Sequence, residues 1–384
     1  MILNKVTDGD LGDLNTPEPH GGNIYRLAEE LNISYSEVLD FSASTNPLGV
    51  SKSVMVAIKD CMMTLNNYPD PDATQLRHEI ARRLNIDSES ILCGNGSTEL
   101  IYLVVRALKP ERLFVPVPAY SEYERAAKSL QAINKDPLDL TYFFLWDNDG
   151  FRLDADKFIK SMSGGDNSAT YRSALTTSAD MVFICNPNNP TGRLISKDDM
   201  IKIADAAKRL KCYLVVDEAF MDFTPSASIV KEVEGNPYLI VLRSLTKFYA
   251  LSGLRIGYGV IPMAIMDMLK QHKEPWTVST LAQEAGITAL NDMVYGSETF
   301  KVLAAEKKTM EDGLKLLDIV YFPSDVNFYL LKMPNAKQVV ASLRRKGILV
   351  RDCSNFMGLD DTYIRVAVKS NRENMRLLKE LARL

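Results

Sequence analysis

Residues 238–258 read YLIVLRSLTKFYALSGLRIGY, and this stretch decides which fold the chain can build. An apolar, β-forming run leads directly into Lys247, with hydroxyls at Ser244 and Thr246 and with Arg255 eight residues further on. A solvated loop lysine is one interpretation of this pattern. The other is a Schiff-base lysine, whose cofactor phosphate lies among the hydroxyls, the arginine and the glycine-containing turn.

Similar apolar runs precede and follow this stretch. The runs RLFVPV, MVFIC, YLVVD, YLIVL and IGYGVI alternate with helical patterns such as STELIYLVVRAL and KDDMIKIADAAKRL. Continuous apolar strands separated by helices are typical of a mostly parallel sheet that is covered on both faces. The sequence therefore predicts the α/β fold class.

Polar residues follow the apolar runs, where ligands bind in doubly wound sheets. A Gly-Ser-Thr turn offers N–H groups and hydroxyls to an anion, although such a turn is more often a simple helix cap. An aromatic residue at a strand end can face a flat cofactor, or it can simply pack in the core. An acid buried at a strand end needs a nearby cation or hydrogen-bond donor. The residues at these strand ends are Gly96, Ser97, Thr98, Tyr120, Asn189 and Asp217.

The composition is that of an ordinary globular protein and excludes several classes of function. The chain has 384 residues, 46% hydrophobic and 24% charged, which suits one large domain and a smaller one. A net charge of -4 gives no field that would gather nucleic acid or an anionic membrane. Five scattered cysteines and three histidines indicate buried, reduced thiols, with neither disulfides nor a metal site. The polar N-terminus and the lack of long apolar runs favour a cytoplasmic location.

Three parts are expected along the chain. Residues 1–45 form an arm with one amphipathic stretch, Asn23–Leu31, and residues 46–275 form the large α/β domain. Residues 276–384 form a small α+β domain, with helices from Thr280 to about Leu317 and strands at Asn327–Lys332 and Tyr363–Val368. The polar stretch Ser161–Asp180 is expected to be a mobile surface insertion without a chemical role.

The motifs NPNNPTG at 186–192, DEAF at 217–220, and SLTK followed by GLRIGY resemble those of fold-type-I, class I/II aminotransferase-like enzymes. The resemblance covers nearly the whole chain and implies pyridoxal 5′-phosphate as cofactor. Lys247 would then carry the cofactor, Asp217 would pair with the pyridinium nitrogen, Asn189 would bind the ring O3′, and Tyr120 would stack on the ring. The residues implied for the cofactor phosphate are Gly96, Ser97, Thr98, Ser244, Thr246 and Arg255. Phe220 departs from the pattern, since many relatives have a tyrosine there whose hydroxyl reaches O3′.

Other motifs narrow the resemblance. His20-Gly-Gly-Asn23, residues 39–49 and Tyr68-Pro-Asp-Pro resemble the histidinol-phosphate aminotransferase branch. Within that branch, HGGN, DEAFMDF and VRDCSNFMGLDDTYIRVAVKS are most similar to L-threonine-O-3-phosphate decarboxylases, which make (R)-1-amino-2-propanol phosphate for cobalamin biosynthesis.

This resemblance implies a small phosphorylated amino acid as substrate. Arg365 would bind its α-carboxylate and Arg351 its phosphate, with His20, Gly21 and Asn46 closing over it and Asn189 also in contact. Tyr68 would reach the cofactor phosphate of a neighbouring subunit, which implies a homodimer. The fork of an arginine suits both anions, although each arginine alone is more often a surface ion-pair partner.

Alternative functions remain open at this level. A histidinol-phosphate-type aminotransferase would use the same lysine with a wider substrate pocket, and a related decarboxylase would accept L-serine O-phosphate, which lacks one methyl group. Whether CO₂ or the α-proton leaves depends on which bond stands perpendicular to the cofactor ring. A noncatalytic cofactor-binding module is disfavoured because both Lys247 and Asp217 are present.

Overall fold

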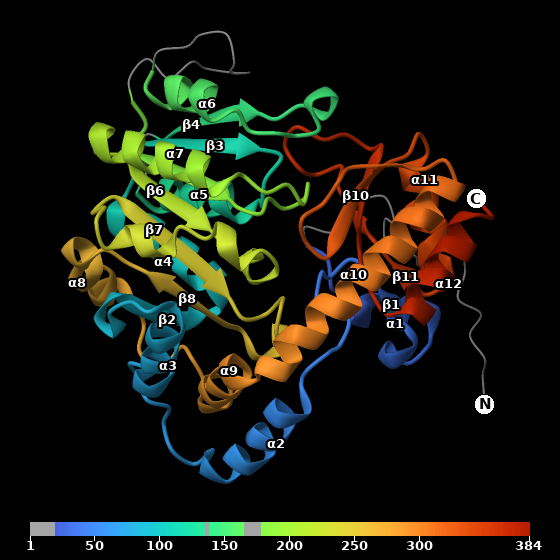
Figure 1. The fold of residues 1–384 in the computed structure, drawn as a ribbon, viewed down its shortest axis with the longest axis horizontal. Coiled ribbons are helices and arrows are strands. Elements are labelled where there is room, and N and C mark those ends of the chain that lie inside the picture. Colours follow the sequence, from blue (N-terminus) through green and yellow to red (C-terminus); the bar gives the residue numbers. More distant parts are fainter. Residues whose placement is uncertain (1–19, 135–137, 165–177) are drawn as a thin grey trace.

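The computed structural model describes residues 20–134, 138–164 and 178–384. A large sheet with helices on both faces lies on one side of the molecule, and a smaller sheet near the C-terminus lies on the other (Figure 1). The long helix α10 (Met293–Leu316) runs between these two regions.

The large sheet has the strand order β2-β8-β7-β6-β5-β3-β4. Only β8 runs antiparallel to its neighbours, so the predicted mostly parallel α/β sheet is confirmed. The five residues of β5 and most of those of β6 are buried, as expected for strands covered on both faces. The strands are β2 (Ile91–Asn95), β3 (Arg112–Val117), β4 (Asp139–Phe144), β5 (Met181–Cys185), β6 (Tyr213–Asp217), β7 (Leu239–Ser244) and β8 (Ile256–Val260).

Two hydrophobic clusters cover the two faces of this sheet. One face packs against α4 (Gly96–Leu108), α5 (Glu122–Asn134) and α8 (Met263–His272). The other packs against α3 (Thr74–Leu84), α6 (Ala155–Met162), α7 (Lys197–Leu210) and α9 (Thr280–Asn291), and α2 (Lys52–Cys61) packs on α9.

The C-terminal region is built on an antiparallel sheet of order β12-β13-β10-β9. Its strands are β9 (Val320–Tyr321), β10 (Phe328–Lys332), β12 (Arg351–Asp352) and β13 (Tyr363–Ala367), with α11 (Ala336–Arg345) and α12 (Asn371–Leu381) beside them. The described part of the arm joins this region, because β1 (Leu39–Asp40) pairs in parallel with β11 (Ile348–Leu349). Helix α1 (Ile24–Leu31) packs onto Leu349.

Short 3-10 helices connect these elements. They are η1 (Tyr35–Glu37), η2 (Met62–Thr64), η3 (Ser88–Ser90), η4 (Asp147–Asp149), η5 (Met221–Phe223), η6 (Pro225–Ala227), η7 (Val230–Val233) and η8 (Ser252–Leu254).

Several local expectations can be compared with this arrangement. The helices and strands predicted after Thr280 are present, whereas the predicted insertion at 161–180 is wrong at its ends. Ser161 and Met162 are buried within α6, and Ala179 N donates to Met162 O, because this segment closes the core beside α6. Residues 165–177 lie outside the described part, and the domain boundaries at 45 and 275 stay predictions.

Two further features concern the cysteines and the apolar character of the helices. All five cysteines are free, and four are buried while Cys61 is partly exposed. Among the described helices, none combines the length and apolar character needed to cross a membrane.

The antiparallel strand β8 brings the turn after β7 against the start of α4. Gly257 is the partner of Ser244 in the sheet, and its backbone lies against the first residues of α4. A Cβ at Gly257 would lie 2.4 Å from Ser97 N and 2.9 Å from Arg243 O. Both contacts are with backbone atoms, so a side chain here cannot be accommodated by a rotamer change.

The Gly257→Ala variant is therefore expected to lose about 1 to 3 kcal/mol of unfolding free energy, the usual cost of overpacking. Urea unfolding measures this loss, with Gly235→Ala as control, because an added Cβ at Gly235 meets no heavy atom within 4 Å. Equal unfolding free energies for the two variants would contradict the close packing of β8 under α4.

Candidate active site

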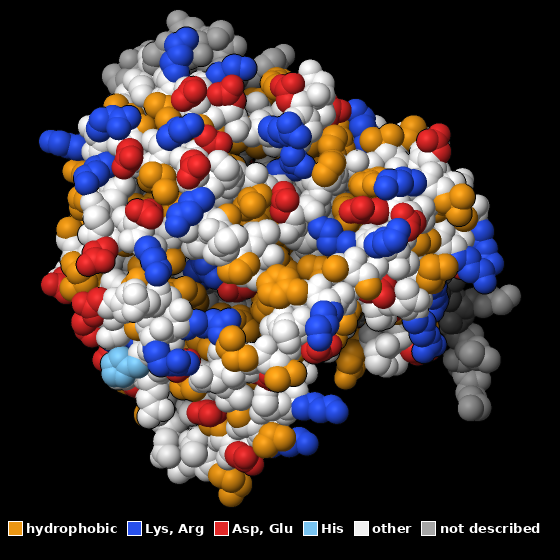
Figure 2. Space-filling model, in the orientation of Figure 1, with side chains coloured by type: hydrophobic (Ala, Val, Ile, Leu, Met, Phe, Trp, Pro, Cys, Tyr) orange, Lys and Arg blue, Asp and Glu red, His pale blue; other side chains and the backbone are white. Residues whose placement is uncertain are grey.

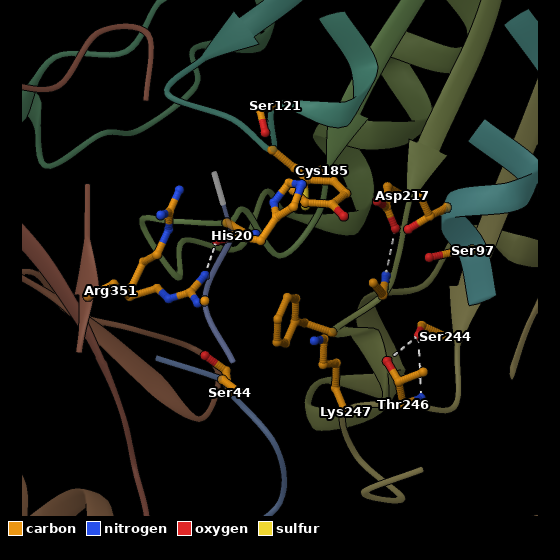
Figure 3. A pocket seen from close by; sticks show the side chains of 18 of the residues that line it. His20, Ser44, Ser97, Ser121, Cys185, Asp217, Ser244, Thr246, Lys247 and Arg351 are labelled. Atoms are coloured by element: carbon orange, nitrogen blue, oxygen red, sulfur yellow. Dashed lines mark hydrogen bonds between the residues drawn. The ribbon is translucent and has the colours of Figure 1, made fainter. Parts of the chain in front are cut away.

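A cavity lies at the carboxyl ends of the parallel strands, between the large sheet and the C-terminal sheet (Figure 3). The carboxyl ends of five strands, β2, β3, β5, β6 and β7, contribute to its wall, as expected for a sheet of this topology. Of the residues predicted from the sequence, the lining contains His20, Gly21, Ser97, Thr98, Tyr120, Asn189, Asp217, Ser244, Thr246, Lys247, Arg255, Arg351 and Arg365.

Lys247 lies on the loop after β7 and lines the cavity beside Phe220. Its Nζ lies 6.0 Å from the centre of the Phe220 ring. Burial, together with the positive charges of Arg365 and Arg255, lowers the pKa of Lys247 to about 8. The neutral amine, which is the form that attacks a carbonyl group, is thus more populated near neutral pH than in an ordinary lysine.

Asp217 ends β6 at the floor of the cavity and is almost completely buried. Its Oδ2 accepts a hydrogen bond of 2.7 Å from Tyr123 Oη, and its Oδ1 accepts one of 3.1 Å from Ala219 N. Burial raises the pKa of Asp217 to about 6, while these two donors and Lys247 oppose the rise. A buried acid of this kind suits a cationic ring nitrogen that compensates for the lost hydration.

A second group of residues forms a cup for an anion at the start of α4. Asn95 precedes this helix without a side-chain cap, so the first N–H groups of α4 are not satisfied by that residue. Gly96 has φ +73°, and a Cβ there would lie 2.6 Å from Arg255 Nη2. The missing side chain therefore lets the guanidinium lie against the helix end. The hydroxyls of Ser244 and Thr246 lie 2.7 Å apart on the neighbouring loop.

The opposite wall carries two arginines from adjacent strands. Arg351 on β12 and Arg365 on β13 are direct partners in the antiparallel register, so their side chains leave the same face of the sheet. Both are buried, and the charge of Arg351 is one cause that lowers the pKa of Arg365. Two like charges side by side in a buried cavity are unfavourable unless an anion binds between them.

Arg365 is held in one orientation by neutral oxygens. Its Nη1 donates to Asn189 Oδ1, and its Nη2 donates to Ser42 O at 2.7 Å, whereas its buried Nε has no hydrogen-bond partner. Burial lowers the pKa of Arg365 to about 10, which leaves the group charged at neutral pH. Arg351 lies over the Phe356 ring at 5.0 Å and donates to Asn355 Oδ1 at 2.8 Å.

The arm closes the remaining side of the cavity. Gly22 N donates to Ser42 Oγ at 2.7 Å, and a Cβ at Gly21 would lie 2.6 Å from Ser42 O. The two glycines thus allow the arm to pass close to the Ser42 turn. His20 then lies beside Tyr120, with 5.9 Å between their ring centres, and Figure 3 shows it projecting into the cavity.

Three of the predicted residues, Gly96, Asn46 and Tyr68, are not on the lining of this cavity, and Tyr68 was expected at the site of a neighbouring subunit. Asn46 does not line it: its Nδ2 donates to Phe248 O and Thr299 Oγ1, and its Oδ1 accepts from Leu48 N. These bonds fix the loop that carries Lys247, and the expected contact of Asn46 with substrate stays a prediction. Tyr68 is 82% exposed and lies against Trp276, away from this chain's own cavity.

Several residues of the site were not singled out from the sequence. Tyr123, three residues after Tyr120 in a helical pattern, is indistinguishable in sequence from a core aromatic. Ser42, Cys185 and Phe356 lie within stretches named above, but nothing in those stretches marks them as site residues. Their roles follow from strands and turns that meet only in the folded chain.

Comparisons with known proteins agree with one another. The pattern of the family described as aminotransferase class I and II matches residues 36–381. The chain is 37% identical over 366 residues to a threonine-phosphate decarboxylase of Salmonella typhimurium, covering 94% of this chain and 95% of that protein. It is 31% identical to an adenosylcobalamin biosynthesis bifunctional protein of Leptospira interrogans, covering 95% of this chain and 41% of that protein.

Among solved structures, a histidinol-phosphate aminotransferase from Clostridium acetobutylicum is similar. It superposes with a TM-score of 0.79 and 32% sequence identity, covering 90% of this chain and 98% of that one. The fold is therefore shared over most of the chain.

The Tyr123–Asp217 contact leads to a prediction on pH. Because the pKa of Asp217 in the folded protein is about 6 and that of an unfolded aspartate is about 3.9, the folded state alone retains this proton between the two values. The contribution of Asp217 to stability is therefore complete below about pH 4 and is lost as pH rises through about 6.

Tyr123→Phe removes a donor that favours the charged carboxylate, so the pKa of Asp217 should rise further. In the cofactor-free protein, the unfolding free energy of Tyr123→Phe should fall below that of the wild type by an amount that grows with pH and reaches about 1.5 to 3 kcal/mol above pH 7. Urea unfolding between pH 5 and 8 measures it. The same change in an Asp217→Asn background should show no such pH dependence; a parallel loss in both backgrounds would exclude the proposed coupling.

Proposed function

The chain belongs to the aminotransferase class I and II family, and from this membership we propose that it is a pyridoxal 5′-phosphate-dependent L-threonine-O-3-phosphate decarboxylase. The reaction converts the substrate to (R)-1-amino-2-propanol O-phosphate and CO₂. The similarity to an adenosylcobalamin biosynthesis protein supports a place in cobalamin biosynthesis.

The residues of the cavity fit this cofactor. Lys247 supplies the amine for the covalent link, buried Asp217 pairs with a protonated ring nitrogen, and Asn189 is placed for the ring oxygen. Tyr120 supplies a flat face, while the start of α4, the two loop hydroxyls and Arg255 suit the phosphate. The chemistry that bound pyridoxal phosphate contributes is an electron sink for the substrate Cα.

The observation that carries the proposal is the pair of buried arginines opposite each other on β12 and β13. A substrate with a carboxylate and a phosphate brings one anion for each guanidinium. Arg365, whose Nε lacks a partner, is assigned the α-carboxylate, and Arg351 with His20 and Gly21 is assigned the phosphate.

Orientation of the carboxylate decides between decarboxylation and amino transfer. Arg365 is tied to Asn189 and to Ser42 O, so a carboxylate bound to it is held in one direction relative to the sheet edge. After CO₂ has left, a proton is needed at Cα, and Lys247 Nζ, with a pKa near 8, is suited to deliver it.

The second candidate is a histidinol-phosphate-type aminotransferase, which the similarity to the Clostridium acetobutylicum structure favours. Incubation with L-threonine O-phosphate distinguishes the two functions. Stoichiometric CO₂ release and aminopropanol phosphate are expected from the wild type and not from Lys247→Ala. Transfer of the amino group from L-histidinol phosphate to 2-oxoglutarate, without CO₂ release, would overturn the proposal. L-serine O-phosphate lacks one methyl group of L-threonine O-phosphate. Its kcat/KM should therefore be lower, by a factor that corresponds to about 1 to 3 kcal/mol.

We also infer a homodimer in which Tyr68 reaches the neighbouring active site. Tyr68 lies on an exposed segment with apolar neighbours Met62, Met63 and Leu65, which suits burial against a second copy. Figure 2 shows hydrophobic side chains at the lower end of the view, where α2 lies in Figure 1.

The two arginines are expected to respond differently to substitution. Arg351→Ala should raise KM for L-threonine O-phosphate, with a smaller loss of kcat, because it removes a clamp on a remote group. Arg365→Ala should lower kcat more, because that group orients the carboxylate that leaves. Lysine should restore neither function well, since an ammonium lacks the planar fork.

Steady-state kinetics with L-threonine O-phosphate and with unphosphorylated L-threonine measures both effects. If Arg351→Ala changed KM by the same factor for both substrates, Arg351 would not recognise phosphate.

A further inference from the structure

His20 enters the cavity next to a buried carboxylate that has no part in the assignments above. His20 Nε2 lies 2.9 Å from Glu122 Oε1, and the side chain of Glu122 is only 6% exposed, against 41% for His20. The partner is thus fixed within the protein, while the histidine is the accessible member of the pair.

Two helices hold the Glu122 carboxylate in place. Glu122 is the first residue of α5, where the helix dipole favours a negative charge. Tyr102 on α4 donates from Oη to Glu122 Oε2 at 2.7 Å, and Arg125 Nη1 lies 3.5 Å from Oε1. The contact with His20 lowers the pKa of Glu122 most, and the hydrogen bond from Tyr102 and the charge of Arg125 add to it, so that the pKa is about 2 although burial opposes the shift. Glu122 is therefore an anion at any pH at which the protein works.

The contact determines which nitrogen of His20 faces the cavity. Because Nε2 lies 2.9 Å from Oε1 of the carboxylate, Nδ1 is the nitrogen left for a ligand. An anion at Nδ1 and the carboxylate at Nε2 would flank the ring on both sides, a setting that an imidazolium satisfies by donating from both nitrogens. The backbone of the arm is fixed separately, by Gly22 N on Ser42 Oγ. His20 is thus attached at two points, through its backbone and through its ring.

We propose that Glu122 is a positioning residue that orients the His20 imidazole, through the contact at Nε2, so that Nδ1 donates to the phosphate of the substrate. This inference rests on the proposed function for the identity of the substrate. Because one partner is 41% exposed, the pair contributes little to folding stability. Its effect should therefore appear in substrate binding.

Kinetics of the holoenzyme tests the role, with a control on the same helix. Glu122→Gln keeps the shape and the acceptor for Tyr102 but removes the charge. It should raise KM for L-threonine O-phosphate about tenfold, the effect of about 1.4 kcal/mol, with kcat changed less than about threefold. Glu124→Gln removes the same charge from the first turn of α5, where Glu124 pairs with Lys128 and not with a histidine. Equal KM values for the two variants would overturn the proposal.

A double substitution tests whether Glu122 acts through His20. In a His20→Asn background, Glu122→Gln should cause no further rise in KM. Independent, multiplying effects would mean that Glu122 acts by another route. Tyr102→Phe removes the donor to Glu122 Oε2 and leaves the charge of Glu122 in place. It should also raise KM, by a smaller factor, and it replaces Glu122→Gln as the test if that variant folds poorly.

Nitrogen NMR gives a readout that does not depend on turnover. The chain has three histidines, His20, His78 and His272, and His20→Asn assigns the relevant signals. Glu122→Gln should shift the ring nitrogens of His20 and leave the other two unchanged, whereas Glu124→Gln should shift none. Unchanged His20 signals in Glu122→Gln would refute the positioning role.

The same signals separate this inference from the proposed function. If the wild type releases no CO₂ from L-threonine O-phosphate, the proposed function fails, and inorganic phosphate becomes the probe. Its dissociation constant, followed at His20, should still rise about tenfold in Glu122→Gln. Equal dissociation constants in the two proteins would overturn the role of Glu122 by itself.

Discussion

Parallel pairing of β5, β6 and β7 is the constraint on which the site depends. Their register aligns Cys185 with Asp217 and Asp217 with Leu242, so three buried strands end at one edge of the sheet. Loops that leave this edge need no strand hydrogen bonds and can carry Asn189, Asp217 and Lys247 to one cavity. The antiparallel strand β8 adds Arg255, and it can do so only because Gly257 lets α4 approach its backbone.

Charge balance is the second organising feature. Among the residues that the structure describes, the cavity lining brings Lys247, Arg255, Arg351 and Arg365 together with one buried carboxylate, that of Asp217. Burial lowers the pKa of Lys247 and Arg365 and raises that of Asp217, so each group is less stable in its charged form than it is in water. A phosphorylated, cationic ring and a substrate with two anions would relieve these costs together, which explains why binding groups and reacting groups are close neighbours.

The arm connects the two regions that form the cavity. It pairs with β11 beside the C-terminal sheet, turns at Ser42 to support Arg365, and reaches the large sheet's helices through His20 and Glu122. The cavity wall therefore depends on a segment far in sequence from the lysine loop. Asn46 belongs to the same system, because its side chain fixes the Lys247 loop from the arm side.

The sequence by itself determined the sheet, its covering helices and the polar residues at the strand ends, because apolar continuity and strand-end position are local properties of the chain. Lys247, Asp217, Asn189 and Arg255 were identified in this way. Only the tertiary structure placed Arg351 opposite Arg365, Tyr123 on Asp217 across 94 residues, and Glu122 on His20. These contacts depend on strand register and on which helices become neighbours, and since long-range packing sets both, no local pattern encodes them.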